Sequence, residues 1–265
     1  MKNALPKACS SLKQYLGNGT FIMDIIGFIH TDFIEKFGIP RQSGLIPELT
    51  GVIEFLPEYR QPEAFKGLQD FSHIWILWEF NRAKKDHWSA TVKPPKLGGN
   101  TRMGVFATRS PFRPNNIGLS SVRLERIEYT EEHGPLLYVS GIDMLDGTPI
   151  LDIKPYIPYS DCHPDATGGF TESIDRTPLE VVFADEPSLQ KILSHLGADK
   201  KSALTALLAG DPRPGYQNDP DRLYGVAFAG YNFRFTVKEK VLTVISIEPL
   251  SPEHTAGCRS KDNKK

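Results

Sequence analysis

The chain has 265 residues, of which 40% are apolar and 24% are charged, close to the average for soluble globular proteins. This length suits one large domain or two modest ones, and the composition excludes wholesale disorder, a collagen repeat and a disulfide-stapled mini-protein. The formal net charge is -1, so the chain as a whole has no excess of basic residues for nucleic acid.

Short strands are predicted up to about residue 160, where apolar runs alternate with Gly and Pro turns. The predicted strands are residues 22–29, 51–56, 71–80, 104–108, 119–129, 136–144 and 150–153. The run from Ile74 to Trp78 is apolar on both faces, which indicates a central strand. Trp75, Trp78 and Phe80 are therefore assigned to the core rather than to a base-stacking surface. The series of strands favours an antiparallel barrel or sandwich.

The pattern changes near Thr177. A helix is predicted for Pro187–Leu196, which begins with Pro and is followed by Gly197, and a second helix for residues 199–208. Three further strands are predicted at residues 223–228, 233–237 and 241–247. The end of the chain therefore forms a small α+β module.

Several classes of site are excluded by what the sequence lacks. The three cysteines (Cys9, Cys162 and Cys258) form no CxxC pair and the histidines show no ligand spacing, so neither a disulfide framework nor a metal site is predicted. P-loop, HExxH and GxSxG motifs are absent, and no Rossmann-type glycine fingerprint precedes a helix. The first residues do not resemble a signal peptide, and the apolar stretch from Phe21 is far shorter than a membrane helix. We expect a cytoplasmic protein with no membrane partner.

Basic residues gather between residues 81 and 126, where ten Lys or Arg and two acids give a net charge of +8. The basic residues are Arg82, Lys84, Lys85, Lys93, Lys96, Arg102, Arg109, Arg113, Arg123 and Arg126. A solvated surface would explain any one of them, but the whole window favours phosphates or an anionic substrate.

Two segments carry most of the candidate chemistry. Residues 108–118 (TRSPFRPNNIG) form a loop that two prolines make rigid, which suits the placement of Arg and Asn side chains on a carboxylate or a base. In residues 143–161, Asp146-Gly147 has the chemistry of a turn, and Asp152 and Lys154 share one face of a strand. An exposed, mutually satisfied ion pair is the alternative explanation for those two residues.

These segments together resemble the TsaA/TrmO-like family. The matching stretches are residues 37–42 (FGIPRQ), 70–77 (DFSHIWIL), 94–100 (PPKLGGN), 104–115 (GVFATRSPFRPN), 117–119 (IGL), 146–156 (DGTPILDIKPY) and 211–214 (DPRP). Asn81 departs from the pattern, since many members have His at that position. The match runs from about residue 26 to residue 247.

The resemblance implies a mainly β fold: an antiparallel β-barrel domain in residues 18–170 and a small α+β domain in residues 178–250. It also implies a homodimer whose interface helps to form the site. The implied activity is transfer of a methyl group from S-adenosyl-L-methionine to N6 of threonylcarbamoyladenosine at position 37 in the anticodon arm of tRNA.

The matched positions supply the expected site residues. The cofactor positions are Pro40, Arg41, Gln42, Arg113, Leu119, Leu145, Asp146, Gly147 and Thr148. The expected substrate-binding residues are Arg109 and Lys154. The acceptor nitrogen carries a proton that must leave, for which Asp152 or Tyr156 is the candidate base. The threonyl carboxylate suits a guanidinium, that of Arg109 or Arg113.

Two alternatives remain open from the sequence. One is a β-barrel RNA-binding module without catalysis, which would keep the basic window but not need the cofactor loops. The other is a methyltransferase of the same fold that acts on a different acceptor.

Overall fold

A computed structural model describes residues 23–83, 87–97, 101–213 and 219–250 of the chain. Its first part is a closed barrel with the strand order β1, β2, β7, β6, β3, β8. These strands are β1 (Gly27–Thr31), β2 (Thr50–Phe55), β3 (His73–Glu79), β6 (Ile117–Thr130), β7 (Gly134–Ser140) and β8 (Thr148–Pro155). Every neighbouring pair in the barrel is antiparallel, which confirms the predicted fold class.

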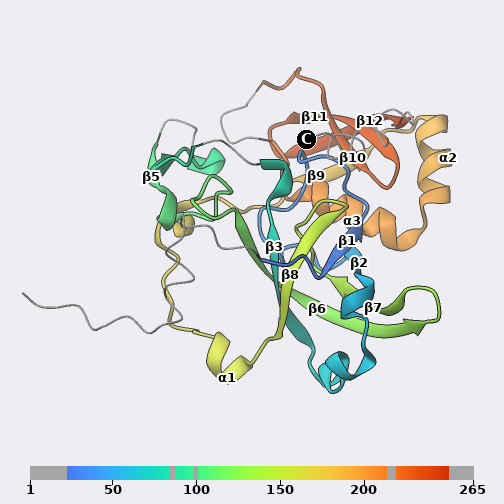
Figure 1. The fold of residues 1–265 in the computed structure, drawn as a ribbon. Coiled ribbons are helices and arrows are strands. Elements are labelled where there is room, and N and C mark those ends of the chain that lie inside the picture. The colour runs from blue at the N-terminus through green and yellow to red at the C-terminus, as the bar shows by residue number, and fades with distance from the viewer. Residues whose placement is uncertain (1–22, 84–86, 98–100, 214–218, 251–265) are drawn as a thin grey trace, which may run out of the picture.

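A second, four-stranded sheet lies against one end of the barrel (Figure 1). Its strand order is β10 (Tyr224–Phe228), β11 (Tyr231–Lys238), β12 (Val241–Pro249) and β9 (Glu180–Phe183), and β9 runs parallel to β12. Two helices accompany it, α2 (Pro187–Leu196) and α3 (Ala198–Ala209). The core is continuous between the two parts, since the rings of Phe33 and Phe228 lie 5.5 Å apart.

Short elements fill the connections. A two-stranded hairpin of β4 (Thr91–Val92) and β5 (Met103–Gly104) stands off one side of the barrel, and α1 (Pro158–Asp161) lies at the end away from the second sheet (Figure 1). The 3-10 turns are η2 (Pro57–Tyr59), η3 (Pro62–Phe65), η4 (Leu68–Asp70), η5 (Asn81–Ala83), η6 (Pro95–Leu97), η7 (Val105–Ala107) and η8 (Gly169–Ser173).

Buried apolar residues alternate with more exposed residues along the strands, and the buried residues form the barrel core. In β3, Ile74 and Ile76 are 0% exposed and Trp78 is 6% exposed, while the residues between them are only partly buried. Trp78 is therefore a core residue as predicted. Trp75 is half-buried, and its indole N–H donates to Oδ2 of Asp161 at 2.8 Å.

Most predicted elements are present, with shifted ends. The first strand begins at Gly27 rather than at Ile22, which lies outside the described residues. The strand predicted at 104–108 is wrong: after Gly104 the chain enters η7, because the Val105 amide donates to Ala90 and the Thr108 amide turns back to Val105. The short strand β9 was not predicted.

Some sequence-based predictions concern residues that the structure does not describe. They are Lys84, Lys85, residues 98–100 of the family pattern, Pro214, Cys9 and Cys258. The predicted domain boundaries, 18–170 and 178–250, stay predictions. Within the described ranges, no helix is long and apolar enough to cross a membrane.

Gly118 allows Trp78 to pack across the barrel wall. The two residues are partners in the β3–β6 register, and a Cβ atom at position 118 would lie 2.2 Å from Cε2 of Trp78. The indole N–H of Trp78 in turn donates to Oγ of Ser120 at 2.9 Å. Only glycine leaves room for the ring in this position.

We expect Gly118→Ala to lower the free energy of unfolding by about 1–3 kcal/mol, because the ring must shift out of a packed core. Urea unfolding followed by tryptophan fluorescence measures this change. Gly104→Ala is the matched control, since a Cβ there meets nothing within 4 Å. Equal losses in the two variants would contradict the packing argument.

Candidate active site

Three segments that are distant in the sequence meet at the carboxylate of Asp143. Oγ of Ser120, at the start of β6, donates to Oδ1 of Asp143 at 2.6 Å. The backbone N–H of Ser43 also donates to this carboxylate. The hydroxyl of Ser43 accepts from the amide of Ser121 at 3.1 Å, so the loop at 40–43 is tied to β6 as well. The predicted cofactor positions 40–42, 119 and 145–148 all adjoin these contacts.

Asp143 is an unusual carboxyl group. Burial raises its pKa from 3.8 to about 6, while the hydrogen bond from Ser120 and the positive charge of Arg109 act in the opposite direction. The group therefore holds its negative charge near neutral pH but takes up a proton in mildly acidic solution.

The turn at residues 145–148 is fixed by backbone contacts. The amide of Asp146 donates to Phe33 O at 2.8 Å, and the amide of Gly147 donates to Ile29 O at 2.9 Å. Gly147 has a φ of 72°, which glycine adopts without strain. The turn predicted from Asp146-Gly147 is confirmed, and it lies at the end of β1.

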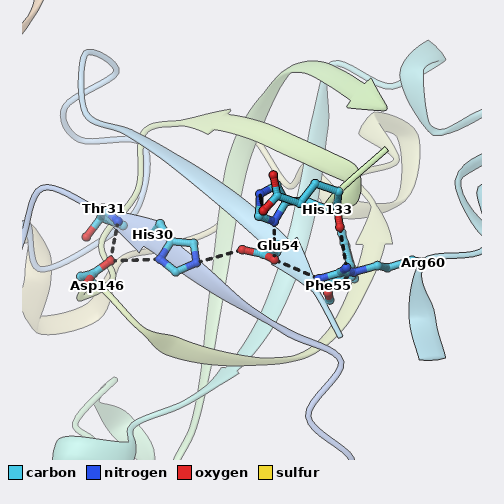
Figure 2. Close-up of polar contacts among 8 residues, drawn as sticks. His30, Thr31, Glu54, Phe55, Arg60, His133 and Asp146 are labelled. Carbon is cyan, nitrogen blue, oxygen red and sulfur yellow. Dashed lines mark hydrogen bonds and ion pairs between the residues drawn. The ribbon is translucent and has the colours of Figure 1, made fainter. Parts of the chain in front are cut away.

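The side chain of Asp146 belongs to a polar network on the outside of the barrel. Figure 2 shows His30 between two carboxylates, with Nδ1 3.4 Å from Asp146 and Nε2 3.6 Å from Glu54. Glu54 also contacts Nη2 of Arg60 and Nδ1 of His133, each at 2.9 Å. The hydrogen bond from His133 is the largest of the effects that lower the pKa of Glu54.

This network holds the loop rather than leaving Asp146 open. Oδ1 of Asp146 also accepts the amide of Thr31 at 3.2 Å. From the other side, Nη2 of Arg82 donates to the carbonyl of Asp146 at 3.2 Å and Nη1 donates to Ile34 O at 3.0 Å. Asn81, which departs from the family pattern, is the residue before Arg82 in η5, so its segment lies against this turn.

The two arginines of the 108–118 loop differ in how their guanidinium groups are held. Arg109 is exposed, and its guanidinium donates to Oε1 of Gln42. Arg113 is folded back on its own loop, where Nη1 donates to Thr108 O at 2.6 Å and Val105 O at 3.2 Å. Arg109 is therefore the more available guanidinium beside the loop at 40–43.

The second domain reaches this region through Asp211. Its carboxylate pairs with Arg213 at 2.9 Å, and its carbonyl accepts from Nζ of Lys96 at 3.1 Å. Desolvation lowers the pKa of Arg41, and the negative charge of Asp211 opposes that shift. The Asp211-Pro-Arg segment thus lies beside two basic residues of the first domain.

Asp152, Lys154 and Tyr156 lie elsewhere. Lys154 and Asp152 form an ion pair of 2.7 Å on the outside of β8, as the alternative explanation for them expected. Tyr156 packs against Trp75, next to α1, with ring centroids 5.6 Å apart. Eight residues of extended chain separate Tyr156 from Thr148, a span of roughly 25 Å. Within one chain, Tyr156 and the 145–148 turn therefore lie at opposite ends of β8.

Sequence reasoning missed Asp143, Ser43 and Ser120. The available signal was a single acid between Ile142 and Met144, both of which are 1% exposed. Lone hydroxyls such as Ser43 and Ser120 give no such signal. Among the described residues, no three His, Cys, Asp or Glu side chains gather in a way that could hold a metal ion.

Comparison with known proteins connects this geometry to a family. Residues 28–162 match the tRNA-methyltransferase O N-terminal domain, and residues 176–250 match the TrmO C-terminal domain. The chain belongs to the TrmO family.

Two bacterial relatives in the TrmO family match along most of their length. The Escherichia coli K12 protein named tRNA (adenine(37)-N6)-methyltransferase is 38% identical over 233 residues, which cover 87% of this chain and 99% of that protein. A Pseudomonas aeruginosa PAO1 protein named putative S-adenosylmethionine-dependent methyltransferase RcsF is 45% identical over 205 residues, 76% of this chain and 86% of that protein. The crystal structure of TrmO from Pseudomonas aeruginosa superimposes with a TM-score of 0.70 at 34% identity, covering 86% of this chain and 98% of that one.

We expect Asp143 to make stability depend on pH. Because its pKa is raised in the folded state, the folded chain binds a proton more readily than the unfolded chain between pH 3.8 and about 6. As the pH rises from 3.8 to about 6, this group therefore lowers the free energy of unfolding by about 3 kcal/mol.

Urea unfolding of the wild type and of Asp143→Asn at several pH values between 4 and 7 tests this, and we expect the variant to lose that part of the slope. Asp152→Asn, which alters an exposed ion pair, is the control that keeps the slope. Parallel curves for wild type and Asp143→Asn would show that the carboxyl is not desolvated.

Proposed function

We propose that this chain is an S-adenosyl-L-methionine-dependent tRNA methyltransferase that acts on N6 of threonylcarbamoyladenosine at position 37. The product would be N6-methyl-threonylcarbamoyladenosine. The supporting observation is that the loop at 40–43, the start of β6 and the turn at 145–148 meet at Asp143, beside the exposed Arg109. Relatives with this fold are named as tRNA (adenine(37)-N6)-methyltransferases.

The residues at this end of the barrel fit such a cofactor. When bound, S-adenosylmethionine supplies a methyl group that its positive sulfur already activates. The guanidinium group of Arg41 suits its carboxylate, and the backbone of residues 145–148 and the exposed Leu119 offer polar and apolar contacts. The side chain of Asp146 is engaged by Thr31 and His30, so its part is to hold the turn.

The main task of the chain is to orient the methyl donor and the acceptor. Aligning donor and acceptor and excluding water can supply roughly 7–11 kcal/mol of a barrier. Asp143 fixes the loop at 40–43 against β6, so that the segments that would hold the cofactor keep one arrangement. The exposed Arg109 is the guanidinium we assign to the threonyl carboxylate of the substrate.

A proton must leave the acceptor nitrogen. From the sequence, Asp152 or Tyr156 was expected to accept it, and Lys154 was expected to bind substrate. These residues lie farther along β8, away from the turn at 145–148. They could act only on a substrate that extends along the outside of the strand, or at a site that includes a second protomer. Asp143 is a third candidate, because it lies at the same end as Arg109 and has a pKa of about 6.

We also propose a homodimer. Leu45, Ile117 and Leu119 are 58%, 38% and 51% exposed, although all three are large and apolar. Ile117 and Leu119 point to the same side of β6, next to the loop that contains Leu45. A second copy that covered these side chains would bring its own residues to the site.

We expect the purified chain to transfer labelled methyl from S-adenosylmethionine to tRNA that carries threonylcarbamoyladenosine, and not to the unmodified transcript. Arg109→Ala should reduce kcat/KM on tRNA by about 10-fold to 100-fold, since a charge-assisted hydrogen bond to the substrate is lost. Arg123→Ala, which removes an exposed arginine farther along β6, is the matched control.

Together with binding measurements for tRNA and S-adenosylmethionine, the same assay separates the alternatives. A non-catalytic RNA-binding module would bind tRNA but not S-adenosylmethionine. A methyltransferase with another acceptor would bind S-adenosylmethionine and leave both tRNAs unlabelled. Equal labelling of both tRNAs would contradict the assignment of threonylcarbamoyladenosine as the substrate.

A further inference from the structure

Two large aromatic side chains lie stacked on the surface next to the β4–β5 hairpin. Trp88 is 52% exposed and Phe106 is 71% exposed. Their ring centroids are 6.2 Å apart, with an angle of 26° between the ring planes. Single exposed apolar residues are common, but a stacked and exposed pair leaves a flat π-surface open to solvent.

The hairpin holds this pair in place. Trp88 lies three residues before the start of β4, and Phe106 lies in η7, directly after β5. The amide of Val105 donates to Ala90 O at 2.9 Å, which joins the two segments next to the aromatic residues. Val105 itself is 1% exposed, so Phe106 is directed outward by a buried neighbour.

Basic residues gather in the segments that carry the pair. The guanidinium carbon of Arg113 lies 5.7 Å from the centre of the Phe106 ring. The described residues 87–97 and 101–113 contain Lys93, Lys96, Arg102, Arg109 and Arg113, and no acid. A π-surface within such a basic field suits an unpaired nucleobase with its phosphates, because every base offers a face for stacking.

We propose that Trp88 and Phe106 form a stacking platform for an unpaired nucleotide of the RNA substrate. The proposal rests on the proposed function, which places the substrate base in the anticodon loop of tRNA. Loops of RNA are recognised through unstacked bases laid on aromatic side chains. Arg113 links the platform to the candidate active site, since it touches Phe106 and belongs to the same loop as Arg109.

Charge favours RNA over a second copy of the chain as the partner of this surface. In a two-fold dimer built on the platform, the same basic residues would face one another. The exposed apolar side chains Leu45, Ile117 and Leu119 form a different surface, on β6 and the loop at 40–45.

The test measures binding of a tRNA anticodon stem-loop by fluorescence anisotropy. We expect Trp88→Ala and Phe106→Ala each to weaken binding by about 5-fold to 100-fold, the range for loss of one stacked base. Trp88→Phe and Phe106→Tyr keep an aromatic face and should stay close to wild type. Tyr159→Ala removes a side chain that is 92% exposed in α1 and is the matched control.

Two further readouts separate stacking from general attraction. The salt dependence of binding should stay unchanged in the platform variants, whereas Lys93→Ala should reduce its slope by about one phosphate contact. A fluorescent 2-aminopurine in the loop should be quenched by the wild type and not by Trp88→Ala.

Wild-type RNA affinity in both alanine variants, or no RNA binding by the wild type, would overturn the proposal. Loss of the dimer in Trp88→Ala, measured by light scattering, would assign the platform to a second copy instead. Binding of S-adenosylmethionine by the same variants, measured by calorimetry, tells failure of the platform apart from failure of the proposed function.

Discussion

The contacts of Asp143 set the arrangement on which the candidate site depends. One carboxylate at the barrel end accepts from a hydroxyl of β6 and from the backbone of the loop at 40–43. Its own segment leads directly into the turn at 145–148. Because a buried acceptor without partners is costly, each of these donors is held in place once the barrel has formed. Ser120 is held in turn by Trp78, which needs the space that Gly118 leaves. The packing of the barrel wall and the geometry of the site are therefore linked.

Around Asp143, some side chains hold the loops in place and others are available to bind a ligand. Asp146, Arg82 and Arg113 make hydrogen bonds to backbone and loop groups, so they shape the site. Arg109 is exposed beside Gln42 and is available to an anionic group. The second domain contributes Asp211, whose carbonyl and charge act on Lys96 and Arg41. This placement gives the second domain a part at the edge of the site as well as in the shared core.

Much of the fold could be predicted from the sequence, because the alternation of apolar residues in strands and the residues that begin and end helices are local signals. The helix Pro187–Leu196 was predicted with its observed ends, since Pro and Gly mark both of them. The segment after Gly104 was predicted wrongly because its apolar residues suit a strand, while a contact with Ala90, distant in the sequence, turns it into η7. For the site, the family resemblance supplied segments, whereas the contacts that join them are not local. Asp143, Ser43 and Ser120 are brought together only by barrel closure, and nothing in their spacing shows it. The same holds for Trp88 and Phe106, whose stacking depends on the β4–β5 hairpin.

A crystal structure of the chain with S-adenosylhomocysteine, the product form of the cofactor, tests the proposed site most directly. We expect it to lie against the loop at 40–43, Leu119 and the turn at 145–148, at the Asp143 end of the barrel. A product molecule bound beside Tyr156 and α1, at the opposite end of β8, would contradict this placement.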